Sequence, residues 1–175
     1  VVDERLLGAC DDGGLRAWST TSGALTSQAR AHAGAVTAMV TSKAGTRVTS
    51  AGERGDAATR DARTGVVTME LENGVDDVAL RCLGVLTSGE LVGGDDVGRI
   101  FVWEDGERFP IWRFATTAEA APMPGKAKRP KPSEGPPDRV HAVSGWVHRS
   151  TGKEFVVSGN GHGILSLWTV RVGKP

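Results

Sequence analysis

A short glycine-containing segment recurs along the chain at an interval of a little over 40 residues. Its first copy is ACDDGGLRAW, and the four copies end on Trp18, Arg60, Trp103 and Trp168. The intervals are 42, 43 and 65 residues, and removing about 22 residues of a Pro-rich insert at 116–138 restores the period in the third. Because a repeat sets the architecture of the whole fold, it constrains this chain more than any single motif.

Each copy has the pattern of a β-hairpin. Small and β-branched residues precede the turn, and alternating apolar residues such as Ile100 and Val102 follow it. One turn position is shared by Gly13, Gly55, Gly98 and Gly163. A positive φ is free for glycine there and costs about 1–2 kcal/mol for a residue with a Cβ atom. We therefore interpret these glycines as turn residues and not as phosphate-binding loops.

Further strands are expected between the hairpins, so that each unit has strands a, b, c and d with the glycine turn between b and c. Strands a are predicted at 35–42, 78–86 and 139–149, and strands d at 65–71 and 109–114. The chain then supplies strands b to d of one unit, two complete units and strands a to c of a fourth, or 14 strands. No segment indicates a helix, so the predicted class is all-β with antiparallel units.

These features resemble the WD-repeat β-propeller family, whose repeat has a Gly-His pair, a Ser-Gly-x-x-Asp-Gly-x-Ile-x-x-Trp-Asp hairpin and about 40 to 45 residues. The resemblance covers residues 1–175 outside the insert at 116–138. It implies about four blades of an incomplete ring, each blade a four-stranded antiparallel sheet. A closed propeller normally needs four to eight blades, so we expect a fragment of a larger propeller. The alternative is that a partner chain or a second copy completes the ring.

The resemblance also implies a hydrogen-bonded chain in each blade, linking a His before strand a, a Ser or Thr on strand b, a turn Asp and a Trp on strand c. The residues matched to this chain or to the turn glycine are Asp12, Gly13, Trp18, His32, Ser50, Gly55, Gly98, Trp103, Ser158, Gly163 and Trp168. No repeat has the full set. In the second repeat Arg54 stands at the Asp position and Arg60 at the Trp position. With Arg60 and the weak strand DAATRD, this blade is expected to be the loosest.

Other site chemistries have weaker signals. Paired acids such as Asp11 and Asp12 lack the 12-residue calcium loop, and turn preference explains the pairs that fall in b–c turns. The histidines have no metal-ligand spacing, and neither a Gly-x-Ser-x-Gly elbow nor a P-loop occurs. We therefore expect no catalytic residue, metal or cofactor. Cys10 and Cys82, 72 positions apart, are expected to be reduced, buried and small apolar residues.

Charge is distributed unevenly along the chain, although 21 basic and 21 acidic residues give a net charge of zero. Residues 70–108 hold ten acids and three arginines, a net of −7, and residues 109–153 hold eight basic residues and three acids, a net of +5. The zero total argues against general nucleic-acid binding. A basic cluster in the insert, either a partner-binding site for an acidic surface or a solvated linker, comprises Lys126, Lys128, Arg129 and Lys131.

These expectations favour a non-catalytic scaffold that presents loops to other proteins, within a large complex. The segment LTSGELVGGDDVGRIFVW is similar to repeats of the echinoderm microtubule-associated-protein-like group and of axonemal WD-repeat proteins. That similarity implies tubulin or axonemal partners and a cytoplasmic location, in the cytoskeleton or a cilium. An RNA- or ribosome-assembly scaffold using the basic insert is the alternative, and a propeller-fold enzyme is a third. No apolar run approaches the roughly 20 residues that cross a bilayer, so no membrane partner is expected.

Overall fold

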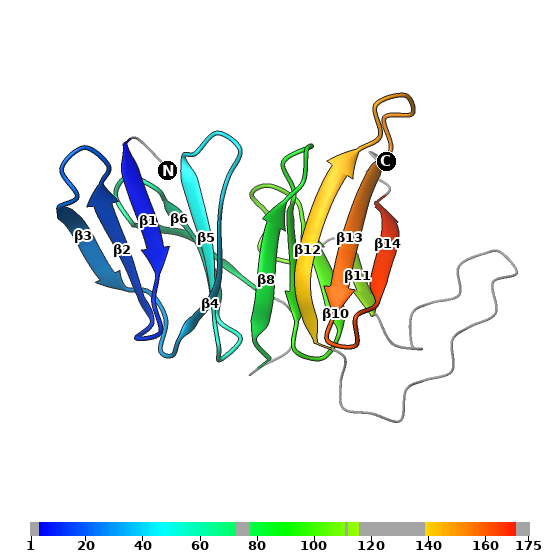
Figure 1. Ribbon diagram of the computed structural model, residues 1–175, viewed down its shortest axis with the longest axis horizontal. Helices are drawn as coiled ribbons and strands as arrows, with labels where there is room; N and C mark the ends of the chain where they lie inside the picture. The colour runs from blue at the N-terminus through cyan, green and yellow to red at the C-terminus, as the bar shows by residue number, and fades with distance from the viewer. Residues whose placement is uncertain (1–3, 73–77, 111, 116–138, 171–175) are drawn as a thin grey trace, which may run out of the picture.

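The structure, a computed structural model, describes residues 4–72, 78–110, 112–115 and 139–170. Within these ranges fourteen β-strands form four antiparallel sheets, none of which closes on itself. The sheets stand side by side in chain order (Figure 1). This arrangement confirms the all-β class and the antiparallel units. The described part of the chain contains no helix long and apolar enough to cross a membrane.

The strands follow one another in space as they do in sequence within every sheet. The first sheet contains β1 (Arg5–Ala9), β2 (Gly14–Ser19) and β3 (Leu25–Arg30). The second contains β4 (Val36–Thr41), β5 (Arg47–Gly52), β6 (Ala57–Asp61) and β7 (Val67–Leu71). The third contains β8 (Leu80–Val85), β9 (Leu91–Asp95), β10 (Arg99–Trp103) and β11 (Trp112–Ala115). The fourth contains β12 (Val140–Val147), β13 (Glu154–Asn160) and β14 (Leu165–Val170).

The observed strands lie close to their predicted ranges. The largest difference is at the end of the third sheet, where the strand predicted at 109–114 begins at Trp112. Pro110 has no N–H group for the strand ladder, which explains the later start.

One register is common to the sheets. In each sheet a small residue on strand b pairs with the strand c residue that lies two positions before the Trp or Arg of the repeat. The side chain of that Trp or Arg is therefore the diagonal neighbour of the small residue on the same face. The small residues are Gly8, Ser50, Gly93 and Ser158, and their diagonal partners are Trp18, Arg60, Trp103 and Trp168. The sequence repeat therefore corresponds to a repeat of strand pairing.

The b–c turns have the conformation that the sequence predicts. The φ angles of Gly13, Gly55, Gly98 and Gly163 are 79°, 86°, 82° and 75°. Each of these glycines donates its N–H to the carbonyl three residues earlier, at 3.1, 3.2, 3.4 and 3.2 Å respectively. The four turns are thus built alike, although their other residues differ.

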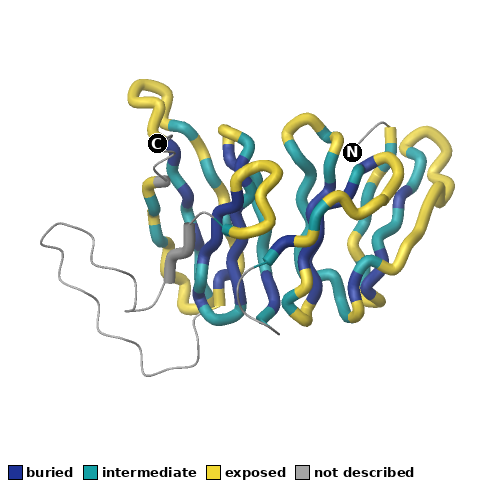
Figure 2. The backbone as a smooth tube through the Cα atoms, turned by 180° about the vertical axis from the view of Figure 1, so that it is seen from behind, coloured by how far each residue is buried: buried dark blue, intermediate teal, exposed yellow. Residues whose placement is uncertain are grey.

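Apolar clusters join each sheet to the next, and the buried residues concentrate in the central sheets (Figure 2). Strand β10 shows how this works, because successive side chains of a strand point to opposite faces. Phe101 and Trp103 pack with residues of the second sheet, including Leu71. Ile100 and Val102 pack with the fourth sheet. Both faces of the third sheet are therefore covered.

The two cysteines correct one expectation. Cys10 and Cys82 are free thiols, but each is only half buried, so the predicted burial is wrong in degree. Cys10 lies at the exposed turn after β1. Cys82 lies on β8, where its Sγ is 3.5 Å from the Val140 carbonyl oxygen and where burial raises the pKa of the thiol to about 12.

Alanine substitutions at two turn glycines should separate backbone strain from steric conflict. Gly163 has open space around the position of a Cβ atom, so Gly163→Ala should lower the free energy of unfolding by about 1–2 kcal/mol from its positive φ alone. At Gly13 a Cβ atom would lie 2.3 Å from the backbone oxygen of His32, so Gly13→Ala should cost clearly more. Urea denaturation of both variants tests this, and equal losses would contradict it.

Candidate functional site

Strand c aromatic rings lie against small residues of strand b. In the fourth sheet the indole N–H of Trp168 donates to the Ser158 hydroxyl at 3.0 Å. In the first and third sheets the strand b residue is glycine, and an added Cβ atom would meet Trp18 at 2.7 Å or Trp103 at 3.1 Å. Glycine at these positions therefore makes room for the ring where no hydroxyl receives its N–H group.

The second sheet contains a buried polar chain. His32 Nε2 is 2.8 Å from Ser50 Oγ, and His32 Nδ1 is 2.5 Å from Asp56 Oδ2. Arg60 donates to the Ser50 hydroxyl oxygen at 3.0 Å and to the Ala31 carbonyl at 2.9 Å. His32, Ser50 and Arg60 are buried, and burial lowers the pKa of Arg60 from its usual value. The guanidinium thus takes the place that an indole takes in the fourth sheet.

Asp56 is the member of this chain that the sequence interpretation missed. The family pattern places the carboxylate at position 54, which is Arg54, but Asp56 reaches His32 from the other side of Gly55. An acid immediately after the turn glycine was the available signal. Arg60 gives no reason to expect a loose second blade, because its guanidinium is buried and hydrogen-bonded, and the strand β6 that holds it is almost wholly buried.

The order Ser50, His32, Asp56 resembles the serine, histidine and aspartate of a hydrolase, since each ring nitrogen contacts one partner. Ser50 is fully buried, however, and its oxygen already accepts the Arg60 hydrogen bond. A substrate cannot reach a nucleophile held in this way. What the arrangement can do is fix the loop before β4 against β5 and β6.

The third and fourth sheets hold their turns differently. Asp95, fully buried, accepts backbone N–H groups from Val97 at 3.0 Å and Arg99 at 2.8 Å, and its other oxygen pairs with the Arg99 side chain at 2.5 Å. Asn160 occupies the same turn position and accepts the N–H groups of His162 and Ile164. The first residue of each turn, and not the predicted position before the glycine, therefore supplies the polar group.

One carboxylate of the third sheet, Asp96, pairs with an arginine of its own sheet and with an arginine that precedes the fourth sheet. Arg81 on β8 makes two hydrogen bonds to Asp96, at 2.7 and 2.5 Å, and Arg139 from the start of the fourth sheet lies 3.3 Å from the same carboxylate. The Arg81 hydrogen bonds, with the positive charges of Arg81 and Arg139, hold the pKa of Asp96 below its usual value.

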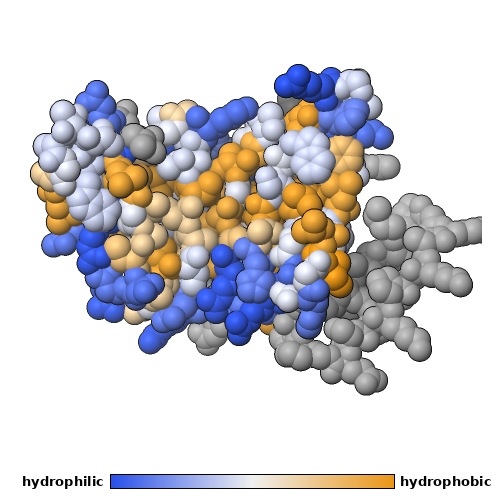
Figure 3. Space-filling view, viewed as in Figure 1, coloured by the Kyte–Doolittle hydropathy of each residue, from blue (hydrophilic) through white to orange (hydrophobic). Residues whose placement is uncertain are grey.

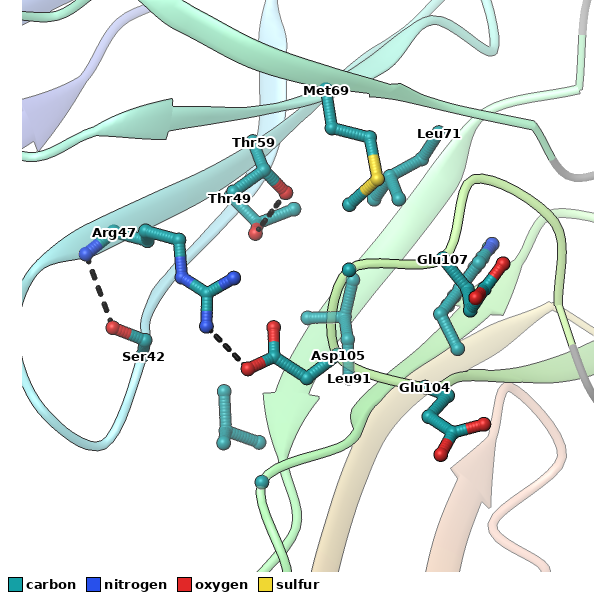
Figure 4. Close-up of a pocket in the computed structure, with 14 residues that line it drawn as sticks. Ser42, Arg47, Thr49, Thr59, Met69, Leu71, Leu91, Glu104, Asp105 and Glu107 are labelled. Carbon is teal, nitrogen blue, oxygen red and sulfur yellow. Dashed lines mark hydrogen bonds and ion pairs between the residues drawn. The ribbon is translucent and has the colours of Figure 1, made fainter.

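A small pocket opens between the second and third sheets (Figure 4). Arg47 extends across it to Asp105 at 2.5 Å, a contact that raises the pKa of Arg47 and lowers that of Asp105. Its apolar wall includes Met69, Leu71, Leu91 and Trp103. Arg5, at the equivalent position of the first sheet, donates to the carbonyls of Ala62 and Arg63. This arginine position therefore joins the first sheet to the second and the second sheet to the third. The pocket is part of the interface between the second and third sheets.

The basic cluster of the Pro-rich insert lies outside the described residues. Its residues are Lys126, Lys128, Arg129 and Lys131. The strands on either side are described: Ala115, the last residue of β11, pairs with Arg99, and Val140, the first of β12, pairs with Asn160. Arg99 and Asn160 adjoin b–c turns, so the chain leaves β11 and enters β12 at the b–c turn end of the sheets.

Replacing Ser50 should show how much the polar chain stabilises the fold. Ser50→Ala leaves His32 Nε2 and one Arg60 N–H group buried without their hydroxyl partner, while the contacts to Asp56 and to the Ala31 carbonyl remain, so the free energy of unfolding should fall by about 1–3 kcal/mol. Ser27→Ala, on the exposed strand β3, is the matched control and should change it by less than about 0.5 kcal/mol. Equal losses of unfolding free energy for the two variants in chemical denaturation would show that the buried polar chain does not stabilise the fold.

Acid should weaken the link between the third and fourth sheets. The pKa of Asp96 in the folded protein lies below its unfolded value near 3.8. The stability that Asp96 contributes to the fold is therefore complete above pH 3.8 and is lost as the pH falls through the folded pKa. Asp96→Asn should therefore lower stability at neutral pH, and the difference from the parent should shrink in acid. Unfolding followed from pH 7 to about pH 2.5 measures this, and a pH-independent difference would contradict it.

A scan against protein-family models finds no match for this chain, and a search of curated proteins finds no significant match. The case for a function therefore depends on the repeated register, the buried polar chain and the charges described above.

Proposed function

We propose that the four sheets are consecutive blades of a WD-repeat β-propeller that acts as a non-catalytic scaffold for protein partners. The observation that carries this proposal is the recurrence of one register, in which a strand c Trp or Arg contacts a small strand b residue in each sheet. A rigid stack of such sheets presents its turns at fixed positions, which suits recognition of other proteins.

The buried polar chain supports a structural role over a catalytic one. Its hydroxyl, on Ser50, is shielded from solvent and bonded to Arg60. The chain therefore contributes rigidity to the loop that precedes β4. Binding then depends on exposed turns and on the charged segments of the sequence.

We assign the scaffold to cytoskeletal or axonemal assemblies of the cytoplasm or cilium, because the third hairpin is similar to repeats of microtubule-associated WD-repeat proteins. The runner-up is an RNA- or ribosome-assembly scaffold, which the basic cluster favours. Exposed acids on the same b–c turn end oppose a polyanionic ligand, among them Asp11, Asp12 and Glu53. This local charge favours a protein partner over RNA.

Cosedimentation with polymerised microtubules tests the proposal directly. The chain should pellet with microtubules, and changing Lys126, Lys128, Arg129 and Lys131 to Gln should weaken binding and flatten its salt dependence. The matched control changes four exposed basic residues of the described sheets to Gln, namely Arg54, Arg63, Arg149 and Lys153. It removes the same charge and should retain binding.

Two outcomes would contradict the assignment. The chain could remain in the supernatant at every microtubule concentration, which removes the cytoskeletal partner. It could instead bind an unstructured RNA tightly, with binding lost only in the cluster variant, which selects the ribosome-assembly alternative.

A further inference from the structure

Both asparagines of the chain, Asn73 and Asn160, are followed by glycine. Asparagine is chemically labile in proteins. Its side chain is most open to attack by the next backbone nitrogen when the next residue is glycine, because glycine has no side chain to block the approach. Asn73 lies outside the described residues, whereas Asn160 is the last residue of β13 and the first of the b–c turn in the fourth sheet.

The third sheet has an aspartate at the position of Asn160. Asp95 pairs with the first residue of β8 and Asn160 with the first residue of β12, and in both sheets the register shifts directly after this pair. One oxygen of each side chain accepts two backbone N–H groups, from the residues two and four positions later. The distances are 3.0 and 2.8 Å at Asp95 and 3.2 and 2.8 Å at Asn160. An amide and a carboxylate therefore support the same turn.

The turn contacts of Asn160 would survive the loss of its amide nitrogen. Both contacts use the side-chain oxygen as the acceptor, and replacing the nitrogen with oxygen leaves this acceptor in place. A carboxylate accepts a backbone N–H group more strongly than a neutral amide does. Asn160 is only half-buried, so solvent reaches the added charge.

The closed turn restrains the nitrogen that would attack. The Gly161 N–H donates to the Arg139 carbonyl at 3.1 Å, so this nitrogen is already engaged. The Asn160 oxygen is held at the same time by the two N–H groups of the turn. Attack on Asn160 Cγ therefore requires the turn to open, and surface loops open at a lower free-energy cost than core strands.

We propose that Asn160 is a site of spontaneous deamidation and that its aspartate product keeps the b–c turn closed. The Gly161 nitrogen attacks Asn160 Cγ, the bond from Cγ to the amide nitrogen breaks, and the proton that the Gly161 nitrogen loses leaves with the amide as ammonia. One water molecule then opens the succinimide ring at either carbonyl, giving aspartate or isoaspartate. Aspartate restores both backbone hydrogen bonds, whereas isoaspartate lengthens the main chain by one carbon and breaks the turn.

Deamidation to aspartate changes the surface without unfolding it. One negative charge is added to the b–c turn end of the sheets, which already exposes Asp11, Asp12 and Glu53. Hydrophilic residues gather along this end, at the lower edge of Figure 3. Because ammonia is lost to solvent, the change runs in one direction and accumulates with the age of the molecule. The inference depends on this turn alone and not on the identity of a partner.

Peptide mass spectrometry of the chain, aged at mildly alkaline pH, tests the site. In concentrated urea Asn73 and Asn160 should lose ammonia at similar rates, because both precede glycine. In the folded chain the rate at Asn160 should fall severalfold below its own rate in urea and should stay measurable, because reaction requires the turn to open. Gly161→Ala is the matched variant and should slow the reaction at Asn160 in urea while leaving Asn73 unchanged.

Two further variants test the product. Asn160→Asp should unfold at the same urea concentration as the parent or at a higher one, because the carboxylate keeps both backbone hydrogen bonds. Asn160→Ala removes the acceptor and should unfold at a lower concentration. The proposal is overturned by an Asn160 that stays unreacted in the folded chain, by a folded rate equal to the rate in urea, or by Asn160→Asp as unstable as Asn160→Ala.

Discussion

The structure depends on the burial of two faces of every internal sheet by its neighbours. A strand points successive side chains to opposite sides, and β10 uses both: Phe101 and Trp103 on one side, Ile100 and Val102 on the other, all nearly inaccessible to solvent. A three- or four-stranded sheet with two apolar faces is not stable alone in water. Each unit therefore exists because the next one covers it, and this requirement makes the register repeat.

Different side chains satisfy that one geometry. The diagonal contact between strands b and c is a Ser–Trp hydrogen bond in the fourth sheet, a Gly–Trp contact in the first and third, and a Ser–Arg hydrogen bond in the second. Arg60 remains compatible with burial because its guanidinium also reaches the Ala31 carbonyl. A pattern that requires Trp at this position does not match the second sheet, although the strand pairing of the second sheet is the same as in the others.

The sequence was sufficient to predict the strands, their antiparallel units and the glycine turns, because these depend on period-2 alternation and on conformations that only glycine adopts cheaply. It was not sufficient for Asp56 or Asp95, because a carboxylate can reach its partner from several turn positions and only three-dimensional proximity selects one. The half burial of Cys10 and Cys82 escaped prediction for a similar reason, since it depends on the turn after β1 and on how closely the third and fourth sheets pack at Cys82. The basic cluster lies outside the described residues, so its role stays a prediction.

The stacking of the sheets requires that Trp103 and Trp168, the strand c aromatic rings of the third and fourth sheets, face the preceding sheet. Nuclear Overhauser contacts between aromatic protons and isotope-labelled methyl groups measure this directly in solution. The account predicts contacts from Trp103 to Ala51 and Leu71 of the second sheet, and from Trp168 to Val92 and Val102 of the third. Contacts from Trp103 to methyl groups of the fourth sheet instead would contradict it, because they would reverse the stacking on which every other conclusion depends.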